Sequence, residues 1–84
     1  MTIDSLYINE TLGSILRRVS NADLNLSVAN RFFREGDFST AMGMYLLLHQ
    51  QRPLKMYPDN ALMAARKLGM DSMLTVDDLL QRVS

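Results

Sequence analysis

Apolar residues recur along most of this chain at steps of three and four, the spacing that lines one face of an α-helix. On this basis five helical segments are predicted, over residues 3–19, 22–34, 38–51, 58–68 and 75–83. No segment alternates strictly between apolar and polar residues as a half-buried strand would, and β-branched residues are scattered. The pattern therefore predicts an all-α fold built from four to five short helices.

The segment 38–51 differs from the others because apolar residues occupy nearly all of its faces. One stripe consists of Phe38, Ala41, Tyr45 and Leu48. The other faces carry Met42, Met44, Leu46 and Leu47. A helix that is apolar all round is normally buried on several sides. We therefore expect this helix at the centre of the fold, with more apolar surface than a single hairpin can cover.

Residues with capping chemistry mark where several of these helices begin and end. Asn21 and Asp37 are predicted N-caps, because their side-chain oxygens can accept hydrogen bonds from free amides of the first helical turn. Gly36 and Gly69 follow predicted helices and suit the left-handed position after a C-cap. The run Thr75–Asp78 resembles a capping box in which Asp replaces the usual Glu.

The middle of the chain carries a spaced set of small, aromatic and turn-forming residues: Val28, Ala29, Phe32, Gly36, Phe38, Ala41, Tyr45 and Pro53. This spacing resembles one tetratricopeptide repeat, a helix–turn–helix unit of about 34 residues. The resemblance implies antiparallel helical hairpins in a tetratricopeptide-like arrangement, with the clearest hairpin over residues 22–55. The chain departs from the family at Asn25, where the family commonly has a large aromatic residue.

The 84 residues suffice for one helical domain arranged around this hairpin. We expect an N-terminal helix within residues 1–21, the hairpin in 22–55, and a degenerate second hairpin in 56–84. A stack of such repeats usually needs about three units to be self-sufficient. The shortfall suggests that the N-terminal helix acts as a cap, that the chain dimerises, or that it is one piece of a longer polypeptide.

A second resemblance concerns the residues themselves rather than their spacing. The runs 29–45 and 60–69 look similar to short helical segments at the N-terminus of some bacterial polysaccharide glycosyltransferases. In those enzymes the segment precedes the catalytic domain. The resemblance implies an accessory domain, and it carries no activity over to this chain, because nothing here suits the binding of a nucleotide sugar.

Composition and charge narrow the classes of function. Lys plus Arg is 9 and Asp plus Glu is 9, so the net charge is zero and the basic stripe needed for nucleic-acid binding is missing. The absence of cysteine excludes disulfides and thiolate chemistry. No signal-peptide pattern and no apolar run long enough for a membrane span occurs. We therefore expect a cytoplasmic protein with no membrane insertion and no nucleic-acid partner.

No constellation of side chains suits catalysis, so we expect neither an enzyme nor a bound cofactor or metal. The single histidine, His49, has no carboxylate at ligand spacing and is expected at the surface or as a cap. Asp77 and Asp78 lie in a first helical turn, where the helix dipole favours acidic residues. Arg31 and Arg34 either grip a phosphate or acidic partner or belong to a solvated face.

The seven methionines lie mostly in the second half of the chain. Methionine fills irregular gaps in cores and also serves adaptable binding surfaces. The default interpretation is that these methionines fill the core. The more specific hypothesis is that they line a groove for an apolar partner helix. The residues expected to contact a partner are Met42, Met44, Leu46, Leu47 and Met63.

Together these features predict a non-catalytic helical scaffold module that binds a protein partner or associates with itself, including as a homodimer. Its specific form would be an N-terminal accessory domain of a bacterial polysaccharide-biosynthesis glycosyltransferase. The alternative is a small cytoplasmic chaperone or adaptor of a bacterial secretion system, with an aggregation-prone helix held in a Met-lined groove. An enzyme or a helix-turn-helix DNA binder is the least favoured hypothesis, because the segment 38–51 is too apolar to lie in a DNA groove.

Overall fold

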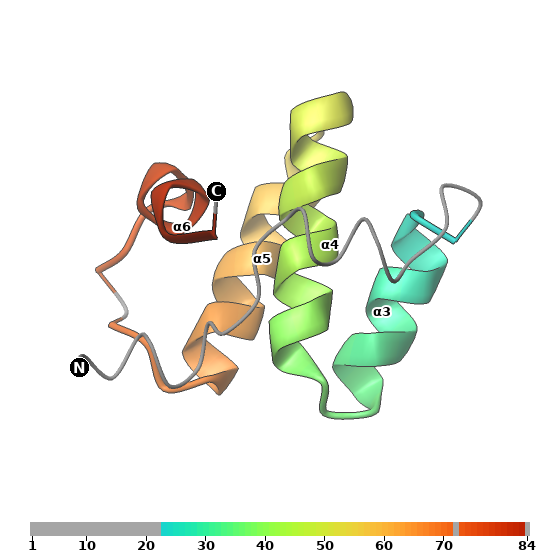
Figure 1. The fold of residues 1–84 in the computed structure, drawn as a ribbon, viewed down its shortest axis with the longest axis horizontal. Helices are drawn as coiled ribbons and strands as arrows, with labels where there is room; N and C mark the ends of the chain where they lie inside the picture. Colours follow the sequence, from blue (N-terminus) through green and yellow to red (C-terminus); the bar gives the residue numbers. More distant parts are fainter. Residues whose placement is uncertain (1–22, 72, 84) are drawn as a thin grey trace.

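The computed structural model describes residues 23–71 and 73–83, and these residues form four helices (Figure 1). They are α3 (Leu26–Arg34), α4 (Phe38–Gln51), α5 (Met56–Lys67) and α6 (Val76–Val83). No strand occurs in this part of the chain, so the prediction of an all-α fold is confirmed for it. The predicted helix over residues 3–19, and with it the N-terminal unit 1–21, lies outside the described residues.

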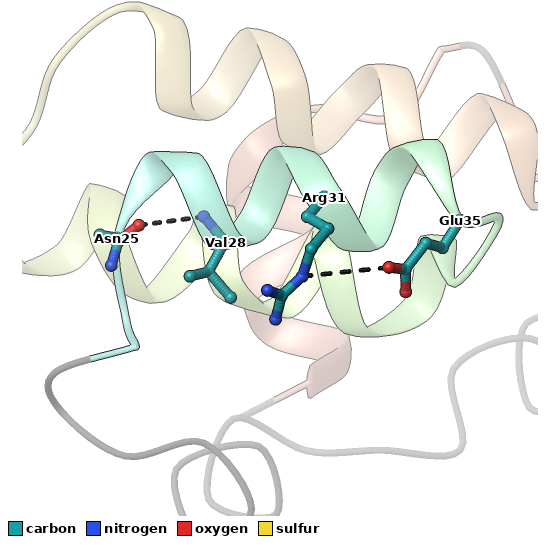
Figure 2. Close-up of polar contacts among 4 residues, drawn as sticks. All are labelled: Asn25, Val28, Arg31 and Glu35. Atoms are coloured by element: carbon teal, nitrogen blue, oxygen red, sulfur yellow. Dashed lines mark hydrogen bonds and ion pairs between the residues drawn. The ribbon is translucent and has the colours of Figure 1, made fainter.

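The N-terminus of α3 corrects the sequence-based prediction, which began this helix at residue 22 with Asn21 as the cap. The cap is Asn25, whose backbone is extended and whose Oδ1 accepts a hydrogen bond of 2.9 Å from the Val28 amide (Figure 2). This bond satisfies one of the free amides that every helix start leaves. The position where the tetratricopeptide resemblance expects a large aromatic residue thus begins the helix instead of lying on its apolar face.

The turn between α3 and α4 has the two features predicted for it. Gly36 has a left-handed backbone with φ of +87°, its amide donates to the Phe33 carbonyl, and the Asp37 amide donates to the Phe32 carbonyl. These are the paired hydrogen bonds of a Schellman motif. The Asp37 side chain then caps α4 by accepting a bond from the Thr40 amide at 3.3 Å. As a result, α3 and α4 lie side by side in opposite directions (Figure 1).

The predicted central position of α4 is confirmed. This helix lies between α3 and α5 and also contacts α6 (Figure 1). Every residue from Thr40 to Leu48 is buried, so the burial extends around the whole helix. Ala29 on α3 and Ala41 on α4 are both fully buried in the core, as expected for small residues where helices approach closely.

One polar contact joins α3 to α4 within this apolar environment. The Tyr45 hydroxyl donates a hydrogen bond to the Asn30 side-chain oxygen, which satisfies a phenol that lies almost wholly inside the core. Burial raises the pKa of Tyr45 because the ionised phenolate would be poorly solvated there, and the nearby charge of Arg34 opposes this effect in part.

Helix α5 begins at Met56, earlier than the predicted start at Pro58. Pro58 therefore lies inside the first turn, where its missing amide leaves no helical hydrogen bond unmade. At the other end, Gly69 has φ of +84°, and the amides of Gly69 and Met70 donate to the Arg66 and Ala65 carbonyls. A second Schellman motif thus closes α5, as the glycine predicts.

Helix α6 starts with the predicted capping box. The Thr75 amide donates to Oδ2 of Asp78 at 2.9 Å, and the Asp78 amide donates to Oγ1 of Thr75 at 3.3 Å. The bond from the Thr75 amide, and then the bond from its hydroxyl, stabilise the carboxylate and lower the pKa of Asp78. Leu79 is fully buried, while Val76 and Leu80 pack at the edge of the core, which anchors this short helix.

Candidate interaction surface

Four of the five residues expected to contact a partner lie inside the core. Met42 is 1% exposed, Met44 and Leu46 are 0% exposed, and Leu47 is 5% exposed. A partner could reach these side chains only if the domain opened. The surplus of apolar surface expected on α4 is therefore covered within the fold, because α4 has helices packed against more than one side.

The fifth residue, Met63, lies on a different surface. It is 47% exposed on α5, and Met56 on the same helix is 46% exposed. These two methionines are seven residues apart, so they lie about two turns apart along one face of α5. Leu54, just before the helix, and Met73, just before α6, are the other large apolar side chains exposed in the described part of the chain.

The orientation of α5 follows from the size of its residues. Its buried positions are Ala61, Ala64 and Ala65, whose small side chains allow a close approach to α4. The long side chains of Met56 and Met63 lie at exposed positions of the same helix. This arrangement leaves apolar surface on α5 that nothing in the described fold covers.

Charged residues lie at both ends of this exposed side of α5. Asp59 is in the first turn, and Arg66 and Lys67 are in the last turn, where each complements the helix dipole. All three side chains are exposed, and neither Asp59 nor Arg66 has an ion-pair partner among the described residues. We call the exposed side formed by these residues the α5 outer face: Met56, Asp59, Met63, Arg66 and Lys67.

The sequence alone singled out only Met63 on this face. Met56 was missed because the helix was predicted to start at residue 58, which placed Met56 in a loop. The signal that could have found the surface is the repeated spacing of seven residues, from Met56 to Met63 and from Asp59 to Arg66. On a helix, that spacing returns each pair to nearly the same side.

Of the two alternatives for the arginines of α3, the structure favours a solvated face for Arg31. Nε of Arg31 lies 3.9 Å from Oε1 of Glu35, and both side chains are more than half exposed (Figure 2). The guanidinium also lies 5.8 Å from the centre of the Phe32 ring. Exposed pairs of this kind contribute about 0–1 kcal/mol. Arg31 thus already contacts two residues close to it in the sequence, which favours a solvated face over the binding of a phosphate.

Other chemistry is sparse in residues 23–71 and 73–83. These residues include no group of three or more His, Asp or Glu side chains that could hold a metal ion. His49 is half-buried near the end of α4, and its buried Nδ1 has no hydrogen-bond partner among the residues that the structure describes. Of the helices in this part of the chain, none has both the length and the apolar character needed to cross a lipid bilayer.

Comparison with known proteins leaves the family open. No protein-family model matches the chain, and no curated protein or solved structure is significantly similar to it. The resemblances to a tetratricopeptide repeat and to a glycosyltransferase N-terminal segment therefore stay predictions based on the residues quoted above.

Proposed function

We propose that this chain is a non-catalytic helical module that binds a protein partner through the α5 outer face. The observation that supports the proposal is the exposure of Met56 and Met63 on one face of a helix whose other side already packs on α4. Leu54 extends the exposed apolar surface at the start of the helix.

The chemistry of this face suits a protein partner. Apolar residues at successive turns of a helix are the usual anchors when two helices pack together. Methionine adapts its shape to the facing surface and is common where helices bind apolar partners. Asp59 at one end of the face and Arg66 at the other would orient such a partner, because exposed charges contribute more to orientation and specificity than to affinity.

The same observations weigh against the chaperone alternative. A Met-lined groove would need methionines from facing helices, whereas Met42 and Met44 on α4 are buried. The exposed methionines of α5 belong to the outer face of a single helix. The more specific form of the proposal, an accessory domain of a polysaccharide glycosyltransferase, stays a prediction from sequence resemblance.

Photo-crosslinking in the cells that make the protein tests the proposal. Benzoylphenylalanine replaces Met63 on the α5 outer face and, as the matched control, Ser27, which is exposed on α3. We expect position 63 to form a discrete covalent adduct, with this chain or with another protein, that position 27 does not form. Equal or absent crosslinking at the two positions would contradict the proposal. Mass spectrometry of the adduct identifies the partner.

A further inference from the structure

We infer that the partner of the α5 outer face is a second copy of the same chain, bound antiparallel about a twofold axis near Met63. This inference rests on the proposed function, because it names the partner of the same surface. It is carried by the charge pattern of α5 together with the exposed methionines.

The spacing of residues on α5 places two lines of side chains next to each other. Met56 and Met63 form one line, and Asp59 and Arg66 form the other, each pair seven residues apart. At a rise of about 1.5 Å per residue, the members of each pair are separated by about 10 Å along the helix. The second line therefore carries a negative charge near the start of the helix and a positive charge near its end.

An antiparallel twofold arrangement makes this pattern complementary to itself. The symmetry reverses the order of residues along the helix while it keeps each line on the same side of the interface. With the axis at residues 62–63, Asp59 of each copy faces Arg66 of the other. The two Met63 side chains then meet at the centre, between two symmetric ion pairs.

The charges also exclude the neighbouring arrangements. A parallel pairing in register would place Asp59 against Asp59 and Arg66 against Arg66. An axis midway between Met56 and Met63 would pair these methionines with each other but would bring the two Asp59 carboxylates together. Like charges placed opposite one another across an interface oppose binding. The formal net charge of zero leaves no overall repulsion between two copies.

One exposed helix face offers a small interface, so the complex is a reversible one that forms at high protein concentration. Interfaces in the lower range of buried area belong to transient complexes. Self-association is therefore measured on the full chain by sedimentation equilibrium from about 10 µM to 1 mM, the range in which weak complexes of this kind dissociate.

Charge reversal at the two facing positions gives the decisive test. Asp59→Arg leaves two arginines at positions 59 and 66, and Arg66→Asp leaves two aspartates there. Two copies of either variant would therefore repel each other. We expect each to weaken self-association by about tenfold or more. Mixing the two variants restores binding, because every Arg then meets an Asp, and the double variant D59R/R66D binds itself. Arg31→Asp is the control, since it makes the same charge change on the exposed side of α3, outside the α5 outer face.

A further variant and a measurement of folding keep the test independent of helix stability. Circular dichroism checks that each variant keeps its helices. Met63→Glu leaves both charge pairs intact and places two carboxylates at the centre, so it also weakens self-association by about tenfold or more. A wild-type chain that stays monomeric at every protein concentration tested overturns the inference. A mixture of the Asp59→Arg and Arg66→Asp variants that fails to associate also overturns it.

The two proposals fail in different ways. If the chain is monomeric but position 63 crosslinks to a different protein, the inference of self-association is wrong and the interaction module stands. If the chain is monomeric and position 63 crosslinks no more than position 27, both are wrong. If Arg31→Asp weakens association as much as Arg66→Asp, the assigned pairing between Asp59 and Arg66 is wrong.

Discussion

Helices α4 and α5 are adjacent in the sequence and in the fold, and both carry methionines, but those methionines have opposite environments. Met42 and Met44 on α4 are buried, whereas Met56 and Met63 on α5 are about half exposed. The difference shows that the content of apolar residues in a helix does not by itself locate a binding surface. What matters is how many sides of the helix its neighbours cover.

The residues at the contact explain why the two helices differ. Helix α4 is flanked by α3 and α5, so large side chains on several of its faces fill space between helices. The buried residues of helix α5 are small, among them Ala61 and Ala64, and its longest apolar side chains, Met56 and Met63, are exposed. The helix with fewer apolar residues is therefore the one that keeps apolar side chains at the surface.

The largest expected effect comes from truncating one methionine in each helix. Met44→Ala removes a fully buried side chain and leaves a cavity, so we expect the free energy of unfolding to fall by about 2–5 kcal/mol. Met63→Ala, the matched variant on α5, should change it by less than about 0.5 kcal/mol. Urea unfolding followed by circular dichroism, at protein concentrations below self-association, measures both. Similar losses in the free energy of unfolding for Met44→Ala and Met63→Ala would contradict the difference in burial between the two methionines.

Enlarging a contact residue of α5 gives the next largest effect. Ala64→Leu inserts a branched side chain at a position with no exposed surface, so we expect a loss of about 1–3 kcal/mol from overpacking. Lys67→Leu places the same side chain on the α5 outer face and should change stability by no more than about 0.5 kcal/mol. A tolerated Ala64→Leu would show that the surroundings of Ala64 are not closely packed.

The starts of the two helices differ as well, and the effect of removing their caps should follow that difference. Asp37→Ala removes the side chain that accepts a bond from the Thr40 amide, at an expected cost of about 1 kcal/mol. Lys55, in the corresponding place before α5, makes no capping bond, so Lys55→Ala should leave stability nearly unchanged. Equal effects of the two substitutions in urea unfolding would contradict this assignment.

The smallest effect concerns acid sensitivity, to which Asp78 at the start of α6 contributes. The pKa of Asp78 is lower in the folded chain than in the unfolded one. The carboxylate therefore contributes to the stability of the fold at pH values above the unfolded pKa, which is about 4. That contribution is lost as the pH falls through the lower folded value. Asp78→Asn should therefore reduce the decrease in urea midpoint between neutral pH and about pH 3, and an unchanged decrease would contradict this assignment.

The sequence located elements well where local chemistry marked both of their ends. The predicted bounds of α4, 38–51, match the structure because Asp37 caps its start and Pro53 follows its end. The predicted start of α3 was wrong because two asparagines, Asn21 and Asn25, offered the same capping chemistry. Propensity alone could not choose between them.

The candidate surface was harder to predict than the helices. The sequence showed that α4 was unusually apolar, but it could not show which of its faces other helices would cover. It also placed Met56 outside its helix, which hid the pairing of Met56 with Met63. Burial is a property of the packed structure, so a surface defined by what remains uncovered requires the arrangement of all the helices.

The order in which the helices pack has a consequence for the speed of folding. The most extensive contacts join consecutive helices, α3 with α4 and α4 with α5, across short turns. Helical domains dominated by such local contacts fold within microseconds to milliseconds, because closing a short loop costs little entropy. The apolar faces of α4 are then exposed only briefly after synthesis. Since exposed apolar surface promotes aggregation during folding, early pairing with neighbouring helices shortens the time in which α4 is exposed to that risk.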